Sequence, residues 1–164
     1  EDLDVMELVA GDPALAYRAG CEHGSNLYAT ELPEGPLDIG VFNAFPKDTE
    51  LCQAGLAMVP LSSSKRDPFT KDATIVMASA CSEGAGWHSV LGPGTALRGK
   101  PVPMARRTFI YSPGVNRYDG ESMYGEYVTL FRTWSELLSA LQQIHGDAAR
   151  VAVFPAGALQ TAAN

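Results

Sequence analysis

The chain has 164 residues, of which 46% are apolar and 19% charged, and this length and composition suit one globular domain able to bury a core. Its net charge of −7 and its isoelectric point near 4.8 argue against a nucleic-acid partner, because phosphate binding needs clustered Lys and Arg. No apolar run approaches the length of a membrane span and no signal peptide is visible, so we expect no membrane partner either.

Three cysteines, Cys21, Cys52 and Cys81, follow one another at intervals of about 30 residues. An odd number of cysteines without a repeated short spacing predicts free thiols in a reducing compartment. We therefore expect a cytoplasmic protein without a zinc site.

The beginning of the chain predicts a helix and a short strand. An apolar run over 5–9 precedes Asp12 and Pro13, which are typical of an N-cap and a first helical residue, and the helix is expected to end near Gly24. Residues 27–32 alternate weakly and predict an edge strand. This start resembles a segment cut from a longer polypeptide.

Residues 36–59 are the stretch around which the rest of the chain is organised. The apolar run 37–42 predicts a buried strand, and a turn that contains a proline follows it. Asp48 or Thr49 is then the expected N-cap of a helix whose first turn holds Glu50. Such a unit often forms a ligand site in α/β proteins, because the helix start points its amides outward at the carboxyl edge of the sheet.

The helix expected after this turn has two unlike faces. The stripe that would pack on the sheet consists of Leu51, Ala54, Gly55, Met58 and Val59. The other side carries Gln53 and Leu56, and a neutral amide beside a leucine is unusual for open solvent. We therefore expect another surface to cover that side.

A second turn is expected at the same edge of the sheet. Residues 61–72 are polar and predict a surface loop, and 73–80 predict the next strand. The strand leads into 81–88, Cys-Ser-Glu-Gly-Ala-Gly-Trp-His, where the glycines allow backbone amides to approach a ligand closely. If the two strands are parallel, this turn opens beside 45–48.

Several residues of the two turns are candidates for chemistry. Glu83 and His88 suit an orienting acid and its base, while the alternative is a capped helix start with His88 on a solvated or packing face. Asp48 is a further possible site residue. We interpret Trp87 and Cys52 as core residues, with the wall of a cleft as the alternative for both.

The rest of the chain predicts further strands and one long helix. A loop over 91–107 carries the basic residues Arg98, Lys100, Arg106 and Arg107, which either attract an anion or are simply solvated. The expected elements after it are a strand at 108–112, a turn at 113–118, a strand at 127–131, a helix at 134–144 with a capping box of Thr133 and Glu136, and a strand at 150–154. This alternation predicts a single α/β domain with a mainly parallel sheet and flanking helices, without fixing the strand order.

The run Pro-Lys-Asp-x-x-Leu-Cys-Gln-Ala at 46–54, after an apolar strand that begins Pro-Leu-Asp-Ile, resembles the C-terminal domain of the nickel-dependent lactate racemase family. The usual form in that family is Pro-x-Asp-x-x-x-Tyr-Gln-x-x-Lys. The likeness continues at 73–86 and is weaker at 150–157, and it covers about two thirds of the chain.

This resemblance implies that residues 1–164 are the C-terminal domain of a longer two-domain protein, with its own N-terminal domain as partner. In the family, a nickel pincer nucleotide on a lysine of the N-terminal domain takes a hydride from a small 2-hydroxy acid and returns it to the other face. Gln53 matches the family's glutamine, which lies in the cleft between the domains. Cys52 replaces a tyrosine beside the cofactor, and Leu56 replaces the lysine that holds the substrate carboxylate.

The replacement at Leu56 matters for the choice of substrate. A lysine facing a carboxylate contributes a charge-assisted hydrogen bond of roughly 1.5–3 kcal/mol, and leucine contributes none of it. Lys47 lies at the helix start and could take over this role. We expect a bulkier 2-hydroxy acid than lactate and no activity from this chain alone; the alternative is a non-catalytic module that binds a small acid or a partner domain.

Overall fold

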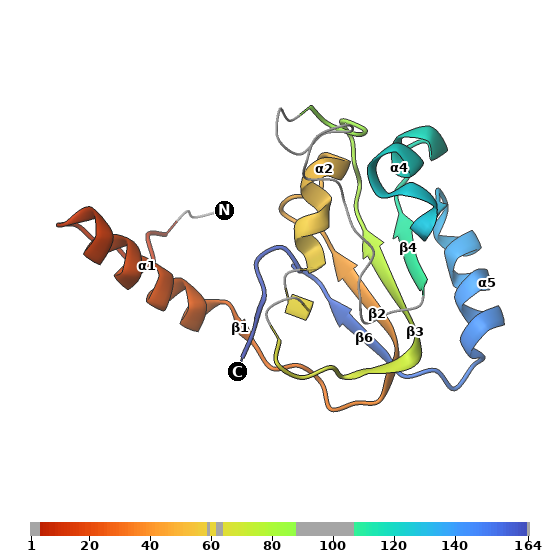
Figure 1. The fold of residues 1–164 in the computed structure, drawn as a ribbon, viewed down its shortest axis with the longest axis horizontal. Coiled ribbons are helices and arrows are strands. Elements are labelled where there is room, and N and C mark those ends of the chain that lie inside the picture. The colour runs from red at the N-terminus through yellow and green to blue at the C-terminus, as the bar shows by residue number, and fades with distance from the viewer. Residues whose placement is uncertain (1–3, 59, 62–63, 88–106, 164) are drawn as a thin grey trace.

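The computed structural model describes residues 4–58, 60–61, 64–87 and 107–163. The helices and strands are, in chain order, α1 (Pro13–Leu27), β1 (Ala29–Thr30), β2 (Leu37–Asn43), α2 (Leu51–Ala54), η1 (Gly55–Met58), β3 (Phe69–Ala78), β4 (Arg107–Tyr111), α4 (Arg117–Tyr124), η2 (Gly125–Tyr127), β5 (Val128–Phe131), α5 (Trp134–His145), β6 (Val151–Phe154) and β7 (Thr161–Ala162). Five strands form a parallel sheet in the order β5-β4-β3-β2-β6, and β1 pairs with β7 in a separate parallel pair (Figure 1). The α/β class with a parallel sheet and flanking helices is thus confirmed.

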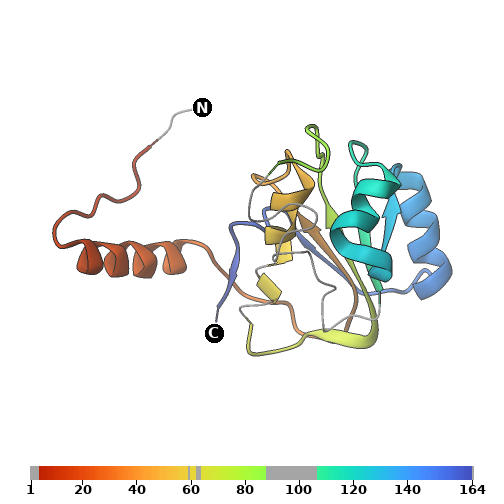
Figure 2. The same cartoon turned by 45° about the horizontal axis from the view of Figure 1, so that its top comes forward.

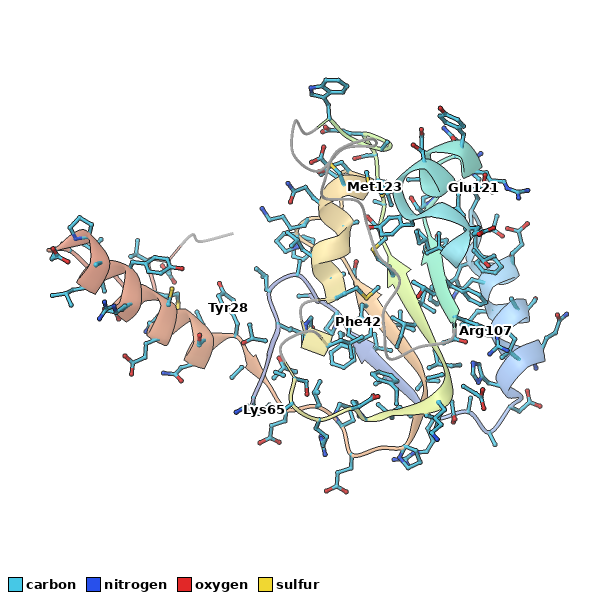
Figure 3. The ribbon with its side chains drawn as sticks, viewed as in Figure 1. Tyr28, Phe42, Lys65, Arg107, Glu121 and Met123 are labelled. Atoms are coloured by element: carbon cyan, nitrogen blue, oxygen red, sulfur yellow. The ribbon has the colours of Figure 1, made fainter. Side chains whose placement is uncertain are left out.

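Residues 4–27 lie outside the packed body. Helix α1 projects away from the sheet in both views, and its side chains have no part of the body beside them (Figures 1, 2 and 3). Asp12 caps it by accepting hydrogen bonds from the N–H groups of Ala14 and Leu15, as the sequence predicts. No residue from 4 to 27 is buried.

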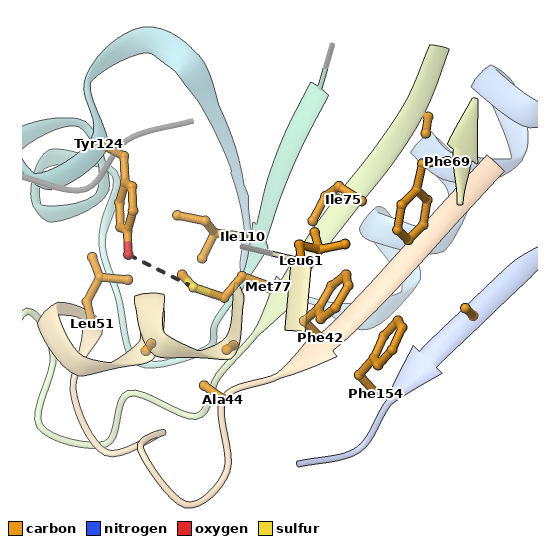
Figure 4. Packing of buried hydrophobic residues seen from close by; sticks show 14 of the residues in the cluster. Phe42, Ala44, Leu51, Leu61, Phe69, Ile75, Met77, Ile110, Tyr124 and Phe154 are labelled. Carbon is orange, nitrogen blue, oxygen red and sulfur yellow. Dashed lines mark hydrogen bonds between the residues drawn. The ribbon is translucent and has the colours of Figure 1, made fainter. Parts of the chain in front are cut away.

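The larger core lies on the face of the sheet that α2, η1 and α4 cover (Figure 4). Apolar side chains from the central strands fill it, among them Phe42, Ile75, Met77 and Ile110, all almost completely buried. The rings of Phe42 and Phe154 stack with centroids 4.3 Å apart, which ties the edge strand β6 to the middle of the sheet. This alternation of inward residues on adjacent parallel strands follows from the two-residue period of a strand.

Helix α5 covers the opposite face over β2, β3 and β4, where Ile39 of β2 is also part of the buried cluster. Leu137 and Leu141 pack there against Val76 and Phe109. Thr133 caps the helix, accepting from the N–H of Glu136 and donating its hydroxyl hydrogen to the carboxylate of that residue, so the predicted helix start is confirmed.

Several predicted boundaries were wrong. Helix α1 runs to Leu27 instead of Gly24, and only Ala29 and Thr30 of the strand expected at 27–32 pair with another strand. Strand β3 begins at Phe69, inside the expected surface loop. The apolar side chain of Phe69 is buried in the larger core, which favours the longer strand.

The helix expected at 51–59 is a single α-helical turn that continues as the 3-10 helix η1. Its N-cap is Glu50 instead of Asp48 or Thr49, and no side chain caps it. Part of the turn expected at 113–118 is the first turn of α4, a helix that was not predicted from the sequence.

Candidate functional site

The turns that follow β2 and β3 lie side by side at the carboxyl edge of the sheet, because these two strands are parallel neighbours. Four backbone hydrogen bonds join residues 48–52 to residues 81–85. The N–H groups of Cys81 and Glu83 donate to the carbonyls of Asp48 and Thr49 at 2.7 and 2.8 Å. In the opposite direction, Leu51 and Cys52 donate to the carbonyls of Gly84 and Ala85 at 3.0 and 3.2 Å. The expected meeting of the two turns is therefore confirmed.

These bonds change the chemistry expected of the helix start. The first N–H groups of a helix are normally free to bind an anion. Here Leu51 and Cys52 use theirs on the second turn, and Gln53 and Ala54 donate to the carbonyl of Glu50 at 3.3 and 3.1 Å. The outward-pointing amides that the sequence predicted are absent at these four residues, so a carboxylate at this edge would have to be held by side chains.

The Glu50 side chain lies against the backbone of Gly86. A Cβ atom on Gly86 would meet the Oε2 atom of Glu50 at 2.2 Å and its Cβ atom at 2.7 Å, and Gly86 has a φ of +77°. Beside it, partial burial together with the carboxylate of Glu50, which accepts the thiol hydrogen bond, raises the pKa of the Cys52 thiol to about 11. Cys52 is accordingly a protonated, weakly nucleophilic thiol at neutral pH.

The second turn is strained at Cys81. This buried residue has a φ of +45°, a conformation that costs a residue with a Cβ free energy. Its Sγ donates to the Oγ of Ser79 at 3.1 Å, and that hydroxyl donates in turn to the carbonyl of Asp48 at 3.1 Å. The turn after β4 packs closely against the backbone of Cys81, since a Cβ on Gly114 would lie 1.9 Å from the carbonyl oxygen of Cys81.

The predicted binding residues of the first turn lie on the outside of this framework. Lys47 is exposed, and its N–H closes the turn by donating to the carbonyl of Ala44 at 2.7 Å. Gln53 is half-buried, while Leu56, one turn further on in η1, keeps 42% of its surface exposed. Asp48 is half-buried and enters the framework through its carbonyl.

The residues of the second turn that the sequence predicts for a site are exposed or lie outside the described residues. Glu83 is exposed and contributes its N–H to the framework. Trp87 is 92% exposed, so its interpretation as a core residue was wrong. His88 lies outside the described residues, as does the basic loop except for Arg107, the exposed first residue of β4.

The sequence reading missed Tyr124, which α4 brings against the start of η1. Its ring is buried, and its hydroxyl lies 4.0 Å from the Sδ of Met77 and 3.1 Å from the point where a Cβ on Gly55 would be (Figure 4). Burial raises the pKa of Tyr124 well above its usual range, and the nearby Cys81 and Cys52 raise it further. Asn116, the N-cap of α4 with Asp119 three residues later, was the signal for this helix.

Among the described residues, no group of three or more His, Cys, Asp or Glu side chains could hold a metal ion. Within the same residues, no helix has both the length and the apolar character needed to cross a lipid bilayer.

The fold and its edge define a parallel α/β domain with two interlocked turns at the carboxyl ends of its central strands. No protein-family model matches the chain, and no curated protein matches it. Among solved structures, the lactate racemase apoprotein from Thermoanaerobacterium thermosaccharolyticum has the same fold, with a TM-score of 0.60 and 16% sequence identity. The likeness covers 91% of this chain and 40% of that protein, so the chain spans less than half the length of its structural neighbour.

Proposed function

We propose that this chain is the C-terminal domain of a racemase or epimerase of 2-hydroxy acids that depends on a nickel pincer nucleotide, and that it forms the substrate side of a cleft between two domains. The observation that carries this proposal is the position of Gln53 and Leu56, which follow the interlocked turns and lie on the partly exposed side of α2 and η1. The likeness in fold to a domain-sized part of a lactate racemase supports it.

In this proposal Lys47 holds the substrate carboxylate. It is the exposed cation of the turn after β2, and the N–H groups of the neighbouring helix start are already used within the chain. Gln53 hydrogen-bonds the substrate, and Leu56 contacts an apolar substituent where the family has a lysine. The preferred substrate is then a 2-hydroxy acid with a side chain larger than the methyl group of lactate.

The cofactor belongs to the partner domain. The described residues offer no cluster of metal ligands, so we assign to them no bond to nickel. When bound in the cleft, the cofactor would accept and return the hydride of the substrate. Cys52, at the position of the family's tyrosine, would lie near it as a neutral thiol. A cytoplasmic location is part of the same proposal.

The roles of Lys47 and Leu56 can be tested on this chain alone by NMR titration with small and bulky 2-hydroxy acids. Loss of a charge-assisted bond in Lys47→Ala should weaken carboxylate binding by a factor of about 10 or more. Lys71→Ala is the matched control, because Lys71 is exposed in β3 away from the carboxyl edge. Leu56→Lys should bring lactate binding up toward that of the bulkier acid; equal weakening by both alanine variants would refute the assignment.

The cofactor requires a separate measurement on the polypeptide that contains the upstream domain. Expressed in a host that makes the nickel pincer nucleotide, it should contain nickel and carry the mass of a lysine adduct. Absence of both, in a host that loads a known racemase, would favour the second candidate, a non-catalytic module that binds a small acid or a partner domain. The absence of the family's lysine at Leu56 is the observation on the side of that alternative.

A further inference from the structure

A groove lies between α4 and the outermost strand of the sheet, β5. Its volume is about 380 Å³, and its lining includes Arg117, Gly120 and Glu121 of α4, Val128 and Leu130 of β5, and Arg132 just after the strand. Binding pockets in proteins have volumes of roughly 300–1,000 Å³, so the groove is large enough to hold part of a ligand. Its lining includes no residue of the turns after β2 and β3, so it is separate from the cleft proposed above.

The side of the groove that β5 forms is an edge of the sheet. Strand β5 pairs with β4 on one side, and the described residues place no strand on its other side. Natural proteins protect such edges with prolines, charged side chains or bulges. Strand β5, with the sequence Val-Thr-Leu-Phe, has no proline and no charge, and its pairing with β4 runs without a shift of register. Its short length of four residues is what limits unwanted pairing.

The backbone polar groups of Leu130 point away from the sheet. The carbonyl of Phe131, the next residue, points to the inner side, where it accepts a hydrogen bond from the N–H of Ser112 at 3.0 Å. Successive residues of a strand direct their N–H and C=O groups to opposite sides, so those of Leu130 are directed away from β4. Leu130 therefore presents one donor and one acceptor in the arrangement with which one strand pairs with another.

The charged side chains of the groove favour an acidic partner. Glu121, the single carboxylate in its lining, is bound to Arg117, whose Nε donates to Oε1 of Glu121 at 2.6 Å. Arg132 is exposed, donates to the carbonyl of Pro113 at 3.0 Å, and makes no ion pair within the part of the chain that the structure describes. A guanidinium has five N–H donors, so Arg132 keeps donors for a carboxylate. The groove thus has one cation beyond its internal ion pair.

We propose that the edge of β5 binds an extended segment of a partner protein, which adds a strand to the sheet and places an acidic side chain at Arg132. Main-chain bonds to Leu130 supply part of the affinity, and the groove beside the strand selects the side chains of the partner. A partner on a four-residue strand makes a small contact, so its binding is weak and reversible. A free carboxylate fits this edge less well, because it has no N–H to donate to the carbonyl of Leu130.

The test is an NMR titration of the isotope-labelled 164-residue chain with the peptide acetyl-Val-Thr-Val-Asp-Val-Thr-amide. The amide signals of 128–132 should shift, and exchange of the Leu130 N–H with solvent should slow, because this group becomes hydrogen-bonded. A peptide with lysine in place of the aspartate should bind about three- to ten-fold more weakly, since it cannot bond to Arg132. A peptide with proline in place of the central valine should also bind more weakly, because proline has no N–H to donate.

Two arginine variants separate the role of Arg132 from a general loss of positive charge. Arg132→Ala should weaken binding of the aspartate peptide about three- to ten-fold and should not weaken binding of the lysine peptide. Arg150→Ala is the matched control, because Arg150 is also exposed, donates to a backbone carbonyl, that of Glu34 at 3.1 Å, and precedes β6 at the opposite edge of the sheet. If Arg132→Ala unfolds, Arg132→Gln takes its place, since its amide can still donate to Pro113.

Four results would overturn the proposal. They are no shift at 128–132 with the peptide at millimolar concentration, equal binding of the proline peptide, equal weakening by the Arg132 and Arg150 variants, and equal shifts with sodium acetate. The last result would make the groove a site for small carboxylates. None of them bears on the cleft proposed above, which is tested at Lys47 and Leu56 by binding of 2-hydroxy acids, so either proposal can fail without the other.

Discussion

The contact between Glu50 and Gly86 predicts that two glycines of the same turn respond differently to alanine. Both have positive φ, +68° at Gly84 and +77° at Gly86, so an added Cβ strains the backbone at either position by roughly 1–2 kcal/mol. Only at Gly86 does the Cβ also collide, at 2.2 Å from Oε2 and 2.7 Å from Cβ of Glu50. At Gly84 nothing lies within 4 Å.

The expected costs follow from these distances. Gly84→Ala should lower the free energy of unfolding by the strain alone, roughly 1–2 kcal/mol. Gly86→Ala should add an overpacking cost of roughly 1–3 kcal/mol, because the Cβ of Glu50 cannot rotate away as a carboxylate can. For a chain of this size each kcal/mol lowers the melting temperature by roughly 2–4 °C.

The assay is urea unfolding of the 164-residue chain, followed by circular dichroism, for both glycine variants and for Glu50→Ala. The unfolding free energies are compared with one common dependence on urea concentration. Glu50→Ala removes the carboxylate and keeps the Cβ. In the double variant with Gly86→Ala, only part of the stability lost to overpacking should therefore be recovered. If Gly86→Ala costs no more than Gly84→Ala, the Glu50 side chain does not lie against the second turn, and our account of the interlocked edge is wrong.

Three further predictions concern the core and the titratable groups. Phe42→Ala should lower the free energy of unfolding by about 3–5 kcal/mol in the same assay, because the site is completely buried. Partial burial holds the pKa of His145 below its usual value, and Arg107 adds to this, so the unfolded chain binds the proton more readily; stability should be constant above about pH 6.5 and fall as the pH drops, less so in His145→Asn. Cys21, which is exposed, should react with iodoacetamide well before Cys52, whose raised pKa keeps the thiol protonated. Mass spectrometry of the labelled peptides would follow the two rates near neutral pH, and equal rates would contradict this prediction.

The larger elements could be predicted from the sequence because their signals are local. A run of β-formers gives β2, and Thr133 followed by Glu136 marks the start of α5. Strand β3 begins earlier than predicted, because the polar residues Thr70 to Asp72 favoured a loop although Phe69 before them is buried. Helix α4 was missed because Gly120 weakens its helical pattern, although the cap at Asn116 was visible.

The candidate site was predictable in place and not in detail. Parallel strands bring the turns after them to one edge, so the meeting of the two turns could be expected from the sequence on the condition that the two strands are parallel, as β2 and β3 are. The use of the Leu51 and Cys52 amides by the second turn could not, because it depends on the separation of two backbones in space. The exposure of Trp87 and the approach of Tyr124 are tertiary effects of the same kind, which no local pattern encodes.

The four bonds that join the two turns run from main chain to main chain, and none of them asks for a particular side chain. The shape of the edge is therefore separable from the groups it presents. A mutation at Lys47, Gln53 or Leu56 should change the groups that this surface presents while the backbone framework beneath stays the same. This edge should tolerate extensive redesign of specificity, with the glycines and not the outward residues as the positions that limit it.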